Sequence, residues 1–156
     1  MSVLEIEEWA GPKPGFIDRI IEAESEVEDD PTNYNAYIRL ARIYSESMVY
    51  TLKAIECYEN AISKGRDIEM SREAARFCMS RASRAIFNTE EKIKIVSAAI
   101  KHLYEIADSD NHNHGEDLTC YNLMAKLYAK LGDKQNAERF RKMANPESGD
   151  KVIIKE

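Results

Sequence analysis

Hydrophobic residues recur every three or four positions along most of the chain, which is the period of an amphipathic α-helix. Within one such stretch, Tyr37, Leu40, Ala41 and Tyr44 fall on a single side of a helix. Short polar segments separate the stretches. The pattern predicts about seven helices and no central strand. The expected helices lie near residues 15–29, 32–47, 51–64, 67–88, 89–108, 117–131 and 134–145.

Local signals mark several of the expected helix ends. Asn88 with Glu91 three residues later matches a capping box, so a helix is expected to begin at about residue 89. Asp30 followed by Pro31 predicts a cap and the first helical position of the next helix. Gly132 with the residue after it predicts the end of one helix and the start of another. Because the connections are short, neighbouring helices are expected to form antiparallel hairpins.

Two distant parts of the chain carry the same pattern of large and small side chains. The residues that match are Tyr37, Leu40, Ala41 and Tyr44 in the first part, and Tyr121, Met124, Ala125 and Tyr128 in the second. The helix that follows each part carries two alanines seven residues apart, which are Ala54 and Ala61, and Ala137 and Ala144. Small residues let two helices approach closely, so each pair is predicted to pack as a hairpin with tyrosines filling its ends.

This pattern resembles the tetratricopeptide repeat, a helix–turn–helix unit of about 34 residues with the signature W-x2-L-G-x2-Y…A-x3-F…P. Tyr37 stands where the signature has tryptophan, and Ala41 replaces its glycine. The first unit has one extra residue in its turn. In the last unit, Arg141 occupies the place of the signature's aromatic residue, and Phe140 comes one residue early. Residues 67–108 match least and are interpreted as a degenerate repeat.

The resemblance implies an all-α fold, an α-α superhelix of antiparallel hairpins over residues 14–146. Its units would cover about 32–65, 67–115 and 117–146, after a capping helix at 15–29. Residues 1–13 would be a flexible lead. The tail 147–156 contains the β-prone run Val152–Ile154, which could drive self-association. A plain helical bundle is the alternative.

The resemblance also implies a binding surface. In tetratricopeptide proteins the first helix of each pair lines a concave groove, and residues one turn away from the packing stripe point into it. By that rule the groove would be lined by Asn35, Ile38 and Arg42, by Arg76, Ser80 and Arg84, and by Asn122, Lys126 and Lys130. The groove would therefore be basic, although the whole chain has a net charge of −6.

We therefore expect a non-catalytic protein–protein interaction module or adaptor that binds an extended, acidic segment of another protein. Arg42, Arg76, Lys126 and Lys130 would contact carboxylates, with Asn35 and Asn122 bonding the backbone of the ligand. RNA binding in the same groove is the alternative, although the acidic charge and the packed tyrosines favour it less. The run of arginines at 72–84 could also be a solvated helix face that pairs with Glu69 and Glu73.

Motifs of catalytic or cofactor sites are absent from the sequence: it contains no GxSxG, no P-loop, no GxGxxG and no HExxH. We therefore expect neither an enzyme nor a cofactor. His112 and His114, in the acidic loop 108–117, are weak candidates for metal ligands. His102 lies on a charged helix face and is expected to be solvated.

The cysteines and the N-terminus bear on where the protein works. Cys57, Cys78 and Cys120 form no CxxC pair and sit among apolar neighbours, which is typical of thiols that act as small hydrophobes in a reducing compartment. The N-terminal residues are acidic where a signal peptide is basic, and no apolar run is long enough to span a membrane. A cytoplasmic location is expected.

Overall fold

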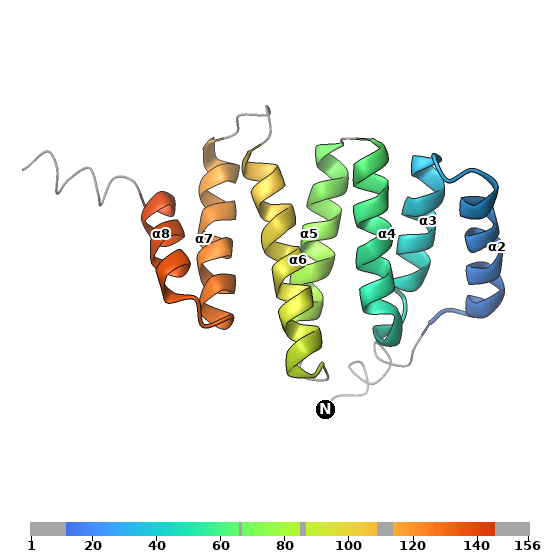
Figure 1. Cartoon of the computed structure of the whole chain (residues 1–156), viewed down its shortest axis with the longest axis horizontal. Helices are drawn as coiled ribbons and strands as arrows, with labels where there is room; N and C mark the ends of the chain where they lie inside the picture. The colour runs from blue at the N-terminus through green and yellow to red at the C-terminus, as the bar shows by residue number, and fades with distance from the viewer. Residues whose placement is uncertain (1–11, 66, 85–86, 109–113, 146–156) are drawn as a thin grey trace, which may run out of the picture. The chain divides into compact units, whose positions relative to one another are not determined.

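The computed structural model describes residues 12–65, 67–84, 87–108 and 114–145. Every regular element in that part of the chain is helical, so the all-α prediction is confirmed there (Figure 1). The elements are α2 (Phe16–Asp29), α3 (Tyr34–Tyr44), the short 3-10 helix η1 (Met48–Tyr50), α4 (Thr51–Lys64), α5 (Ile68–Ala82), α6 (Thr89–Ala107), α7 (His114–Lys130) and α8 (Lys134–Ala144). None of these helices is both long enough and apolar enough to cross a membrane.

The helices belong to two compact units, Met1–Met70 and Ser71–Glu156, with the boundary inside α5. In the first unit α3 packs against both α2 and α4. In the second unit α7 packs against both α6 and α8. A continuous repeat domain over 14–146 stays a prediction. The tail 147–156, with its predicted role in self-association, lies outside the described residues.

The α3–α4 hairpin is built around small residues, as its sequence pattern predicts. Ala41, Ala54 and Ala61 are completely buried, which allows the two helices to approach closely. Tyr44 closes one end of the hairpin and stacks on Tyr50 of η1, with ring centroids 5.3 Å apart. The turn that was expected to hold one extra residue therefore contains η1, and η1 supplies an aromatic ring to the core.

The α7–α8 hairpin uses a different aromatic arrangement. Phe140 is only 3% exposed, and its ring centroid lies 6.1 Å from that of Tyr121 and 5.4 Å from that of Tyr128. The phenylalanine that comes one residue early in the repeat signature thus fills the space between the two tyrosines. Gly132 has a φ of 80° in the turn, a left-handed conformation that favours glycine, so the predicted helix end is confirmed.

Two of the predicted helix starts have different outcomes. The capping box before α6 is confirmed, since the Asn88 side chain accepts a hydrogen bond of 2.9 Å from the backbone N–H of Glu91. The cap predicted at Asp30 for the next helix is wrong. Asn33 caps α3 instead by accepting from the backbone N–H of Ala36. Asp30 is the C-cap of α2, and its carboxylate accepts two hydrogen bonds from Thr32 in the intervening turn.

Three helix ends differ from the expected positions. Helix α3 ends at Tyr44, before the expected residue 47, because the chain turns into η1. Helix α5 ends at Ala82, so the arginine-rich segment 67–88 is not helical throughout. Helix α7 begins at His114, three residues earlier than expected.

Candidate functional site

An ion pair joins α5 and α7 in the second unit. Arg72 Nε and Nη2 each donate a hydrogen bond of 2.7 Å to Glu116, 44 residues away in the sequence. The hydrogen bonds from Arg72 hold the pKa of the Glu116 carboxyl below its ordinary value. Both residues lie near the beginning of their helices, which run in the same direction (Figure 1). The expected partners of the arginine run were the local Glu69 and Glu73, so sequence reasoning missed this long-range pair.

The ion pair determines which way the predicted binding residues of these helices face. Arg76 and Ser80 are exposed and follow Arg72 by about one and two helical turns. On α7 the exposed residues Asn122, Lys126 and Lys130 form a stripe along one side of the helix.

Helical geometry shows that these two exposed stripes share one side of the second unit. When both helices are viewed along their axes from the same end, the two exposed stripes lie in opposite rotational directions from the ion pair. If the stripe of α5 lies clockwise from Arg72, the stripe of α7 lies anticlockwise from Glu116. Two parallel helices that are joined at this ion pair therefore present both stripes on the same side of the pair. Five of the six groove residues predicted for these helices thus form one surface, which we call the α5–α7 face.

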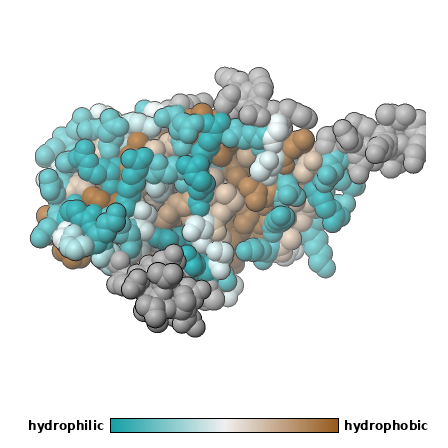
Figure 2. Space-filling model, turned by 180° about the vertical axis from the view of Figure 1, so that it is seen from behind, coloured by the Kyte–Doolittle hydropathy of each residue, from teal (hydrophilic) through white to brown (hydrophobic). Residues whose placement is uncertain are grey.

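The α5–α7 face also has an apolar component. Met79 on α5 and Leu123 on α7 are half-buried, and each lies on the side of its helix that carries the ion pair. Figure 2 shows hydrophobic side chains gathered over part of the second unit, with hydrophilic ones around them. The exposed Glu69 lies on the same side of α5 and contributes one negative charge.

Arg84, the sixth residue, is placed differently. It lies beyond the end of α5 and is half-buried, with its backbone N–H bonded to the carbonyl of Arg81. Arg81 is also buried, and its guanidinium packs over the ring of Phe77 at 4.7 Å from the centroid. The arginine run is therefore neither one solvated face nor one row of binding residues, because its members face different surroundings.

The three groove residues predicted for the first unit lie together on α3. A hollow on this helix is lined by Asn35, Ile38, Arg39, Arg42 and Ile43. Asn35 and Arg42 are exposed, whereas Ile38 is buried. Arg39 was missed because it is adjacent to the predicted stripe, and it forms an ion pair with Glu26 of α2.

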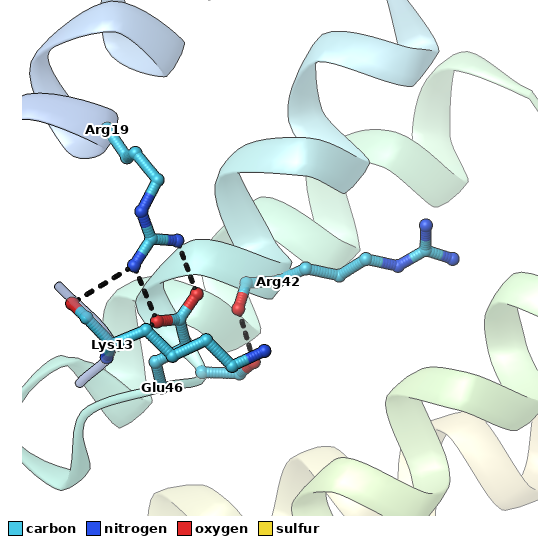
Figure 3. A network of polar contacts seen from close by, with 5 residues as sticks. Lys13, Arg19, Arg42 and Glu46 are labelled. Carbon is cyan, nitrogen blue, oxygen red and sulfur yellow. Dashed lines mark hydrogen bonds and ion pairs between the residues drawn. The ribbon is translucent and has the colours of Figure 1, made fainter. Parts of the chain in front are cut away.

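A second ion pair closes the α2–α3 end of this unit (Figure 3). Both terminal nitrogens of Arg19 bind the Glu46 carboxylate, at 2.6 and 2.8 Å, and the backbone N–H of Lys13 donates to the same group. This arrangement keeps the pKa of Glu46 below its ordinary value, chiefly through Arg19. The Arg42 side chain extends away from the pair (Figure 3), and Arg42 lines the hollow.

His102 is buried, so the expectation of a solvated histidine is wrong. Its side chain is only 1% exposed, and Nδ1 lies 2.6 Å from Oε1 of Glu105. Its Nε2 is buried without a hydrogen-bond partner. The reason is periodicity: His102 comes four residues after the buried Ala98, on the side of α6 that also buries Ile106.

The thiols and the acidic loop were the other chemical candidates. Burial raises the pKa of the Cys57 thiol to about 12 and that of Cys120 to about 11, so the reactive thiolate is scarce near neutral pH. His112 lies outside the described residues, and only the backbone of His114 is described. Among the described side chains, no group of three or more His, Cys, Asp or Glu gathers in a way that could hold a metal ion.

Each unit thus has its own candidate surface, the α3 hollow in the first unit and the α5–α7 face in the second. No protein-family model matches this chain, and no curated protein matches it.

Proposed function

We propose that this chain is a non-catalytic interaction module of the tetratricopeptide type that binds an extended, acidic segment of another protein in the cytoplasm. The observation that carries the proposal is the charge of the α5–α7 face. Arg76, Lys126 and Lys130 are exposed there, while the carboxylate of Glu116 is already paired with Arg72. An acidic protein that keeps cations together on one face favours ligands of opposite charge.

The residues of this face suit a chain more than a compact ligand. The cations lie along two parallel helices, and successive stripe residues are about one turn apart, roughly 5.4 Å along each axis. Carboxylates of an extended segment can therefore bind them one after another, with Arg76 able to hold a carboxylate through two parallel hydrogen bonds. Asn122 offers both a donor and an acceptor to the backbone of the ligand.

The apolar residues between the helices add a second requirement. Met79 and Leu123 retain partly exposed apolar surface beside the cations. A large apolar side chain within the acidic ligand would bury this surface, and fully burying such a side chain stabilises a complex by about 1.5–3 kcal/mol. The preferred ligand is thus an acidic segment with one apolar residue.

A fluorescent, glutamate-rich peptide with one central leucine is a direct probe of this proposal. We expect it to bind the full chain at low salt and to be released as salt rises, because the contacts are charged and solvent-accessible. Replacing Arg76 and Lys126 by glutamate should weaken binding at least about tenfold, a loss of about 1.4 kcal/mol or more. Fluorescence anisotropy measures both effects.

The control for that experiment keeps the change in net charge the same. Lys64→Glu combined with Lys94→Glu alters two exposed lysines outside the α5–α7 face. Equal binding by this control and by the Arg76/Lys126 variant would refute the assignment of the face. A labelled single-stranded RNA in the same assay tests the alternative. Preference for RNA over the peptide, lost in the Arg76/Lys126 variant, would assign the face to nucleic acid.

A further inference from the structure

The outward side of α2 combines exposed apolar and acidic side chains. Ile17 and Ile21 are 56% and 60% exposed, and they lie one helical turn apart. Large aliphatic side chains at this exposure leave much apolar area in water, and burial of that area would be favourable. The other exposed residues around them are mostly acidic, namely Asp18, Glu22, Glu28 and Asp29. Arg19, the one basic residue of α2, is paired with Glu46.

The outward side of α8 has the opposite charge. This helix buries Phe140 against α7 and exposes Lys134, Arg139, Arg141 and Lys142. Met143 is 37% exposed beside them and supplies apolar surface. The aliphatic stems of the basic side chains add further apolar area when their charged ends are paired. The single acidic residue of α8, Glu138, is paired with Arg141.

We propose that α2 of one molecule docks against α8 of a second copy of this chain. Charge complementarity carries the choice of partner: acids surround Ile17 and Ile21 on α2, and bases surround Met143 on α8. Pairing of α2 with α2 or of α8 with α8 would bring like charges together, which is unfavourable. The contact is therefore heterologous, and an open assembly keeps one unused α2 surface at one end and one unused α8 surface at the other.

A heterologous contact of this type produces open, concentration-dependent chains of molecules unless the rotation between copies closes a ring. One helix face on each side is a small interface, at or below the roughly 1,200 Å² that marks the lower limit of stable complexes. The assembly is therefore weak and reversible. Because its charges are exposed, raising the ionic strength weakens it further, as the Debye length shrinks to about 8 Å at 0.15 M.

Sedimentation velocity of the full chain over a series of concentrations tests the proposal. We expect the average mass of the wild type to rise with concentration at low salt, and to rise much less at high salt. Two variants each place like charges on both surfaces: Asp18→Lys with Glu22→Lys makes α2 basic, and Arg139→Glu with Lys142→Glu makes α8 acidic. Each variant alone should stay monomeric. An equimolar mixture should associate again, because each surface of one variant then complements a surface of the other.

The charge-swapped mixture controls for folding, since variants that had failed to fold would not restore association together. A wild type that stays monomeric at all concentrations would overturn the proposal. Pairing of α2 with α8 within one molecule would give this result. Association that persists in both variants would also overturn it. Deleting residues 147–156 tests the other candidate source of self-association, which is the C-terminal tail. Loss of association on this deletion would assign the contact to the tail, whereas unchanged association supports the α2–α8 contact.

Discussion

Arg72 on α5 and Glu116 on α7 share two hydrogen bonds of 2.7 Å across 44 residues of sequence. The two side chains are 20% and 25% exposed, so water screens the pair only partly. The geometry is bidentate, which is the strongest form of such a pair between side chains. The pair connects the two helices that carry the proposed α5–α7 face.

A double-mutant cycle with Arg72→Met and Glu116→Gln should therefore give a coupling free energy of about 1 kcal/mol, at the upper end of partly exposed pairs. Urea unfolding of the four proteins measures it. Glu90 and Lys94 of α6 provide the comparison, because they are 3.6 Å apart but much more exposed. Their coupling should not exceed about 0.5 kcal/mol. Equal coupling in the two cycles would show that the bidentate, partly buried geometry of the Arg72–Glu116 pair contributes nothing.

The same pair predicts how stability depends on pH. Arg72 lowers the pKa of Glu116 below its ordinary value of 4.5, so the folded state binds this proton less tightly than the unfolded state. Its contribution is therefore complete above about pH 4.5 and is lost as the pH falls through the lower pKa of the folded protein. Urea unfolding between pH 3 and 6 should show a shallower acid loss of stability in Glu116→Gln than in the wild type. An unchanged slope would contradict the shift.

The helices and their caps could be predicted because their causes are local. The capping box of Asn88 and Glu91 spans four residues, and helical periodicity is visible within a few turns. Even there, the start of α3 was misplaced, since Asn33 caps this helix and Asp30 with Pro31 belongs to the turn before it.

Features that depend on distant parts of the chain were harder to predict from the sequence. Nothing near Arg72 in the sequence points to Glu116, so the local acids were the natural expectation. His102 is different, since its place four residues after Ala98 was a usable signal that its charged neighbours obscured. Of the candidate groove residues, Asn35 and Arg42 on α3 and those on α5 and α7 are exposed as periodicity predicts. Ile38 is buried, and Arg84 could not be placed because α5 ends before it.

Phe140 gives a prediction about the register of the last hairpin. It is buried between Tyr121 and Tyr128, whereas its neighbour Arg141 is exposed. Phe140→Ala should reduce the free energy of unfolding by about 3–5 kcal/mol, because it removes a buried ring and leaves a cavity. Arg141→Ala should change it by no more than about 0.5 kcal/mol. Chemical denaturation distinguishes them, and a larger effect at position 141 would contradict the observed register.

The capping box gives a prediction with a control in the same helix. Asn88→Ala removes the acceptor for the backbone N–H of Glu91, so it should cost about 1 kcal/mol of stability. Ser97→Ala changes an exposed position in the middle of α6, where alanine is at least as good a helix former as serine. This control should be neutral or slightly stabilising. Thermal unfolding compares the two, and a neutral Asn88→Ala would show that the cap contributes little.

The close packing of α3 on α4 gives the last prediction. Ala54 is completely buried in this hairpin, as are Ala41 and Ala61, so a larger side chain has no free space there. Ala54→Leu should destabilise the fold by about 1–3 kcal/mol through strain, although leucine favours helices almost as much as alanine. Ala129→Leu on the exposed side of α7 adds the same side chain in solvent and should have little effect. If urea unfolding shows Ala54→Leu to be as stable as Ala129→Leu, the small residues are not what allows α3 and α4 to pack closely.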